Sequence, residues 1–110
     1  MSHYLIQASY SKQGISDLIS NPQDRAAIVQ SVIEGLGGTM NSFFFAFGDY
    51  DAVLIAELPD NVTAAALAMA VGSTPGLSEY KTTVLITSQE AIEAMQKASG
   101  VGYKLSLIHI

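Results

Sequence analysis

The segment Phe43–Leu58 constrains the fold more than any other part of this chain. It reads as an apolar strand, a tight acidic turn at Gly48-Asp49-Tyr50-Asp51 and a second apolar strand. Two successive strands joined by a short turn pair in antiparallel fashion, so the segment predicts a β-hairpin. We expect Gly48 to take the positive φ that glycine tolerates. The rest of the chain should pack around this hairpin.

The patterns around the hairpin predict two further strands and three helices. Strands are expected at residues 3–10, 39–47, 52–58 and 80–87. Helices are expected from an N-cap at Asn21 to Gly37-Gly38, from Asp60 to Gly72, and over residues 89–98, with a short or irregular helical turn in residues 11–20. The order β-α-β-β-α-β with an extra C-terminal helix is the ferredoxin-like arrangement. It is an α+β fold with one four-stranded antiparallel sheet and both helices on one face.

Apolar residues occupy both faces of the two central strands. Leu5 and Ile6 point in opposite directions, and so do Val53 and Leu54. Two helices cover only one face, so the other face would meet water in a monomer. The mean hydropathy of +0.32 is also high for a small domain. We therefore expect a homodimer, or a higher homo-oligomer, of stacked sheets.

The charge balance argues against polyanionic partners. The formal net charge is −5, the isoelectric point is near 4.6, and the five Lys and Arg residues form no run. Neither nucleic acid nor an anionic membrane surface is expected as a partner. No signal peptide is seen, and no apolar run reaches the roughly 18–20 residues of a membrane helix. We expect a cytoplasmic protein.

The chain length suits one domain, which we place at residues 1–98. Residues 99–110 fit the fold poorly. The alternation in Lys104–Ile110 suits an exchanged edge strand. Alternatively the tail is adventitious, because Leu105–Ile110 resembles a translated transposon adapter. We assign no function to it.

Three residues are candidates for acid–base chemistry. Asp51 opens a strand whose same face carries Val53 and Ile55, and a carboxylate beside apolar walls is suited to act as a base. His3 is the alternative base, and Tyr50 is the candidate hydrogen-bond donor. The structural alternative is a hairpin turn whose carboxylates face water.

Aromatic residues are the candidates for a ligand pocket between sheet and helices. They are Tyr4, Tyr10, Phe43, Phe45, Phe47, Tyr50 and Tyr80. Alternation places Phe43, Phe45 and Phe47 on one strand face and Met40, Phe44 and Ala46 on the other. Tyrosine hydroxyls around an apolar pocket would orient a small aromatic molecule. The alternative is that the phenylalanines fill the core or a dimer interface.

Metal and nucleophile chemistry have little support. The chain has no cysteine, which excludes disulfides and thiolate ligands. His3 would need Asp49, Asp51 or Glu57 in an unusual geometry to hold a metal, so neither a metal nor another cofactor is expected. No nucleophile elbow and no phosphate-binding loop is seen.

The segment Phe47-Gly48-Asp49-Tyr50-Asp51-Ala52-Val53 resembles the motif of the GYD-domain family, whose members carry a Gly-(Asp/Glu)-Tyr-Asp turn. Tyr4-Leu5-Ile6, Gln13-Gly14-Ile15, Gly37-Gly38 and the alanine-rich second helix also match in order and spacing. Residues 16–21 depart from the family pattern. The resemblance implies a ferredoxin-like protein akin to the dimeric α/β-barrel group, which includes cofactor-free monooxygenases, chlorite-dismutase relatives and stress-response barrels. It implies no particular reaction.

Three functions remain open from the sequence. The first is a homodimer that binds a small apolar or aromatic molecule. The second is a cofactor-independent enzyme, monooxygenase-like or isomerase-like, with Asp51 or His3 as base and Tyr50 as donor. The third is a structural or interaction oligomer without a ligand.

Overall fold

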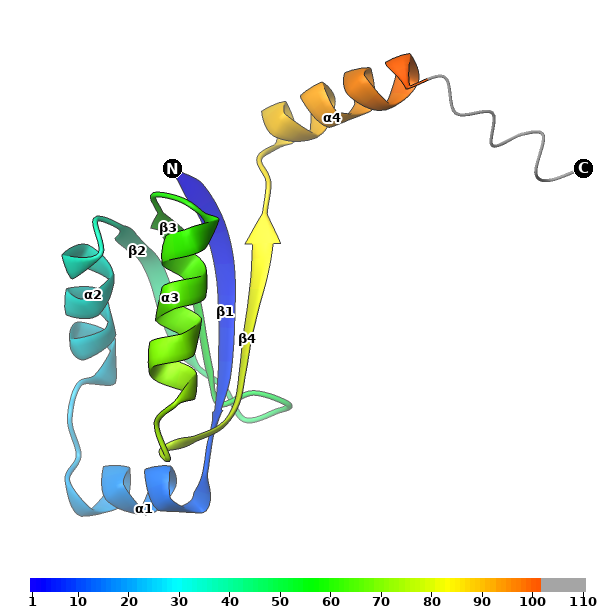
Figure 1. Cartoon of the computed structure of the whole chain (residues 1–110). Helices are drawn as coiled ribbons and strands as arrows, with labels where there is room; N and C mark the ends of the chain where they lie inside the picture. Colours follow the sequence, from blue (N-terminus) through cyan, green and yellow to red (C-terminus); the bar gives the residue numbers. More distant parts are fainter. Residues whose placement is uncertain (102–110) are drawn as a thin grey trace, which may run out of the picture.

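The computed structural model describes residues 1–101 and contains a four-stranded antiparallel sheet with α2 and α3 lying over one face (Figure 1). The strands are β1 (Ser2–Tyr10), β2 (Thr39–Phe45), β3 (Ala52–Leu58) and β4 (Leu77–Leu85), in the order β2-β3-β1-β4. The helices are α1 (Lys12–Ser20), α2 (Arg25–Gly35), α3 (Asn61–Gly72) and α4 (Ser88–Gly100). The predicted α+β, ferredoxin-like fold is confirmed.

Each helix begins at a side chain that satisfies a free backbone N–H. The N-caps Ser11, Asp24, Asp60 and Thr87 each accept a hydrogen bond from the N–H three residues later. The predicted N-cap at Asn21 is wrong. Residues 12–20 form a regular helix that ends at Asn21, whose N–H donates to the Asp17 carbonyl. The second helix therefore starts later, at Arg25.

The core lies between the helix face of the sheet and the helices. Its buried members are Tyr4, Ile6, Ile33, Leu54, Ala56, Leu58, Ala64 and Leu67. Tyr4 is fully buried, and its hydroxyl donates to the Asn61 side-chain oxygen at 2.7 Å. This bond satisfies the polar end of a buried tyrosine and joins β1 to the start of α3.

A β-bulge in β2 changes which face of the sheet some of its residues point to, compared with the prediction. Met40 pairs with Ala56 and Phe43 pairs with Leu54, because the register shifts between Met40 and Ser42. The extra residue places Met40 on the same side as Phe43, where both contact the core. Strict alternation, which put these two residues on opposite faces, is wrong here.

The hairpin connection is longer than the tight turn that was predicted. β2 ends at Phe45 and β3 begins at Ala52, so Phe47 lies in the connection and not in the strand. Gly48 does not take the predicted positive φ, and a Cβ there would meet open space. Among the described residues the glycine with positive φ is Gly37, at +84°, after the end of α2.

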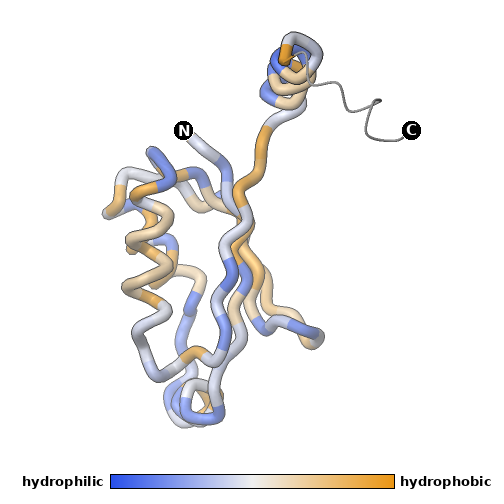
Figure 2. Tube along the Cα trace, turned by 45° about the vertical axis from the view of Figure 1, so that its right-hand side comes forward, coloured by the Kyte–Doolittle hydropathy of each residue, from blue (hydrophilic) through white to orange (hydrophobic). Residues whose placement is uncertain are grey.

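The second face of the sheet has no helix over it. Leu5, Val53 and Ile55 point to this face, together with Phe44, whose side chain is 68% exposed. Helix α4 lies apart from the sheet and from α2 and α3 in both views (Figures 1 and 2), and none of its residues is buried. An isolated chain thus exposes two apolar surfaces, the open face of the sheet and the side of α4 that carries Ile92 and Met95.

Two predictions concern the ends and the environment of the chain. The segment Lys104–Ile110, considered as an exchanged strand or an adventitious tail, lies outside the described residues. Within residues 1–101, no helix combines the length and the apolar character that a membrane crossing needs.

Candidate functional site

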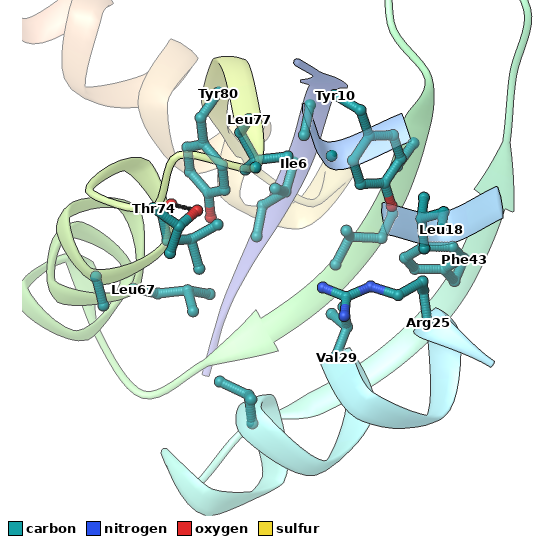
Figure 3. Close-up of a pocket in the computed structure, with 18 of the residues that line it drawn as sticks. Ile6, Tyr10, Leu18, Arg25, Val29, Phe43, Leu67, Thr74, Leu77 and Tyr80 are labelled. Carbon is teal, nitrogen blue, oxygen red and sulfur yellow. Dashed lines mark hydrogen bonds between the residues drawn. The ribbon is translucent and has the colours of Figure 1, made fainter. Parts of the chain in front are cut away.

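A cavity of about 540 Å³ lies between the sheet and helices α1, α2 and α3 (Figure 3). Its floor is formed by Ile6 and Ala8 of β1 and by Ala52 and Leu54 of β3. Its apolar walls include Val29, Val32, Ile33, Leu67, Val71 and Leu77. A volume of roughly 300–1,000 Å³ with mostly apolar walls is typical of small-molecule sites.

Helix α1 closes one end of the cavity through a close backbone approach. Gly14 is buried, and a Cβ built on it would overlap the carbonyl oxygen of Gly76. The Ser11 N–H donates to the same carbonyl at 3.0 Å, and the Ser11 hydroxyl donates to the Pro75 carbonyl at 2.8 Å. Glycine at position 14 therefore lets Asp17 and Leu18 reach the cavity wall.

Polar side chains reach the cavity at only a few points. They are Tyr10, Asp17, Gln23, Arg25, Thr74 and Tyr80. The Tyr80 phenol is a neutral hydrogen-bonding group at physiological pH, and burial raises its pKa further. The Thr74 hydroxyl donates to the Val71 carbonyl at 2.7 Å, which leaves its oxygen free to accept.

Arg25 supplies the positive charge of the cavity wall. It is the first residue of α2, directly after the N-cap Asp24. Its aliphatic stem lies near Phe43 and Leu18, and its guanidinium points away from them into the cavity (Figure 3). Its Nε atom is buried without a hydrogen-bond partner. Within residues 1–101 no carboxylate lies within 4 Å of the guanidinium.

The structure brings three of the seven aromatic candidates into the cavity wall. Tyr10, Phe43 and Tyr80 line it from β1, β2 and β4. Tyr4 does not line it, because its ring fills the core beside α3.

The other three aromatic candidates lie outside the cavity wall. Phe45 is at the end of β2, and its ring meets that of Phe43 edge to face at a centroid distance of 5.3 Å. Phe47 is fully exposed in the β2–β3 connection, and Tyr50 is half-buried there. Because β2 ends at Phe45, Phe47 does not lie on the strand face on which alternation had placed it. Tyr50 lies in the same connection.

The acid–base candidates do not share a site. Asp51 directly precedes β3, and its carboxylate accepts a hydrogen bond from the Tyr10 N–H. His3 lies on the face of the sheet opposite the cavity, where its Nε2 is 3.5 Å from the Glu57 carboxylate of the neighbouring strand. Neither residue lines the cavity, and neither does Tyr50.

No group of three or more His, Cys, Asp or Glu side chains in the described part of the chain is placed to hold a metal ion. His3 has Glu57 beside it, and Glu57 also accepts a hydrogen bond from the Asn41 amide at 3.2 Å. This cluster is a cross-strand polar contact on the open face of the sheet.

A family model described as "GYD domain" matches residues 4–95. The chain belongs to the GYD domain family. In this GYD domain the motif residues close the β2–β3 connection onto the end of β1: the Ser9 hydroxyl donates to the Asp49 carbonyl, and Asp51 bonds to Tyr10.

Comparison with solved structures finds a chain described as "crystal structure of FFRP-DM1". It is 12% identical to this GYD domain, with a TM-score of 0.49, and the match covers 78% of this chain and 100% of that chain. Among curated proteins no match was found.

Sequence reasoning missed the charged and polar part of the cavity wall. Arg25 was treated as one of five scattered basic residues, and Gln23 and Thr74 were not singled out. One local signal was present. A cation in the first turn of a helix opposes the helix dipole, so Arg25 sits where helix stability alone would favour Asp or Glu.

Proposed function

We propose that this GYD domain binds a small, largely apolar molecule in the cavity between sheet and helices, and that it does so as a homodimer. The observation that carries the proposal is the cavity itself, about 540 Å³ with mostly apolar walls between the sheet and helices α1, α2 and α3. A concave apolar site of this size is typical of small-molecule binding.

The arrangement supports binding rather than chemistry. An enzyme with Asp51 or His3 as base would need one of them in the cavity wall, and both lie elsewhere. The titratable groups that reach the cavity are Tyr10, Asp17, Arg25 and Tyr80. Of these, Tyr80 and Tyr10 carry neutral phenol groups, which suit hydrogen bonding to a ligand.

The open face of the sheet supports self-association. Phe44 and Ile55 are 68% and 37% exposed on a face that no helix covers. Exposed apolar patches of this kind mark interaction surfaces. Helix α4 carries a second apolar stripe, with Ile92 and Met95 exposed one turn apart. A second copy of the chain that covers both surfaces would complete the dimeric barrel.

Native mass spectrometry of the purified protein, before and after denaturation, tests the binding proposal. We expect a small component that is lost on denaturation, or a vacant cavity that takes up an added apolar probe. Val29→Trp fills the cavity from α2 and should abolish binding. Val62→Trp makes the same change at an exposed position of α3 and should leave binding intact. Equal binding by both variants would reject the cavity as the site.

A further inference from the structure

The cavity wall combines one unpaired cation with an apolar surround. Arg25 and Asp17 are the charged side chains in the wall. The Asp17 side chain is exposed and accepts a hydrogen bond from the Gln13 amide at 2.8 Å. No ion pair within 4 Å joins it to Arg25. The guanidinium therefore faces the cavity without an acidic partner from the described residues.

Arg25 is half-buried, and the part of its guanidinium that is buried, the Nε, carries a cost because it has no partner. Removing a charge from water without a compensating partner opposes folding, and buried charges in proteins are normally paired. The Arg25 Nε is already withdrawn from water and makes no hydrogen bond. A bound anion would satisfy it, and the planar fork of arginine matches a carboxylate through two parallel hydrogen bonds.

The rest of the cavity indicates what such an anion is attached to. Among residues 1–101 the wall offers no second cation, which favours a single negative charge over a phosphate dianion. Ile6 presents apolar surface between the Arg25 guanidinium and the Tyr80 side of the cavity, and Val29 and Leu67 add apolar wall beside it (Figure 3). The Tyr80 hydroxyl and the Thr74 oxygen can bind one polar group at that side.

We propose that the cavity is selective for apolar monocarboxylic acids, with the carboxylate on Arg25 and the hydrocarbon part over the sheet. This inference rests on the proposed ligand-binding function. It adds the chemical class of the ligand and the residue that recognises it.

Calorimetric titration with matched probes tests the selectivity. The probes are 2-naphthoic acid and 2-naphthamide, which have the same size and differ in charge. We expect the acid to bind the unaltered protein about 10-fold or more tightly than the amide. Arg25→Gln should weaken binding of the acid about 10-fold or more and change the affinity for the amide less than about 2-fold. The affinity of Arg25→Lys for the acid should lie between those of the unaltered protein and Arg25→Gln.

The control for charge alone is Lys12→Gln. Lys12 is exposed on α1 outside the cavity wall, and its replacement changes the net charge by the same amount as Arg25→Gln. This variant should bind both probes like the unaltered protein. A loss of acid binding equal to that of Arg25→Gln would show that long-range electrostatics, not contact, is responsible.

The outcomes separate the inference from the function on which it rests. Suppose that both probes bind the unaltered protein, that Val29→Trp abolishes the binding of both, and that Arg25→Gln changes the affinity of neither. The cavity then binds ligands, but the carboxylate assignment is overturned. Tighter binding of 2-naphthyl phosphate than of the acid also overturns it. If no probe binds at all, the proposed function fails and the inference fails with it.

Discussion

The carboxylate of Asp51 accepts a hydrogen bond from the backbone N–H of Tyr10, with an oxygen–nitrogen distance of 2.9 Å. The Asp51 N–H donates to the Ala8 carbonyl, also at 2.9 Å, and its carbonyl accepts from the Ala46 N–H. The register of β1 against β4 shifts between Ser9 and Tyr10. The Asp51 carboxylate therefore accepts a hydrogen bond from a backbone N–H at the position where the strand pairing is irregular. Asp51, the last residue of the Gly-Asp-Tyr-Asp motif, thus holds the hairpin connection against β1.

Replacement of Asp51 should therefore affect stability. We expect Asp51→Ala to lower the free energy of unfolding by about 1–3 kcal/mol, because it removes a charge-assisted hydrogen bond. Asp51→Asn keeps an acceptor and should cost less. Urea unfolding at fixed protein concentration measures both. Asp49→Ala, in the same connection, is the control, since Asp49 contributes only its carbonyl to Ser9. Unchanged stability of Asp51→Ala would contradict the structural role.

Gly14→Ala should destabilise the protein, although alanine favours helix. The new Cβ would overlap the Gly76 carbonyl and push α1 off the end of the cavity. We expect a loss of about 1–3 kcal/mol, as for other overpacked sites. Gly35→Ala is the matched control, because Gly35 is also helical and has open space around it. It should gain up to about 1 kcal/mol. Thermal melts that rank the two variants the other way would contradict this packing.

Val53→Asp should convert the proposed dimer into monomers. Val53 lies on the open sheet face, where a carboxylate would be buried against the partner. Multi-angle light scattering measures the mass. Val62→Asp, at an exposed site on α3, makes the same chemical change on the helix side and should leave the mass unchanged. A Val53→Asp protein that remains dimeric would place the interface elsewhere.

The N-cap of α3 should make stability depend on pH in the acid range. Hydrogen bonds from the Thr63 hydroxyl and N–H lower the pKa of Asp60 below its ordinary value of 3.8. The unfolded chain therefore binds the proton more tightly. The contribution of the cap is present above the ordinary pKa and is lost as the pH falls through the lower, folded-state value. Urea midpoints measured from pH 6 to 2 should fall less steeply in Asp60→Asn, which keeps an uncharged acceptor. An identical slope in the two proteins would show that this carboxylate makes no such contribution.

The local signals in the sequence were sufficient for the order of the strands and of helices α2, α3 and α4, but not for the regular helix α1. The expected helices from Asp60 and over residues 89–98 were found close to where they were predicted, because the caps Asp60 and Thr87 that start them depend on residues only three apart. The sequence also placed Leu5 and Ile6 on opposite faces of β1, because side chains of a strand alternate whatever its partner is, although it did not decide which face is buried. These features fixed a ferredoxin-like order before any contact was known.

What required tertiary structure was every feature that depends on residues distant in sequence. Met40 faces the core because the bulge in β2 is set by pairing with β3. Asp51 bonds to Tyr10, and Gly14 meets Gly76, across separations of 41 and 62 positions that no local pattern encodes. Arg25 becomes a candidate ligand-binding residue only when α2 places it over the cavity beside Phe43. Local propensity is set by neighbours along the chain, whereas a cavity is set by how separate elements fail to fill the space between them.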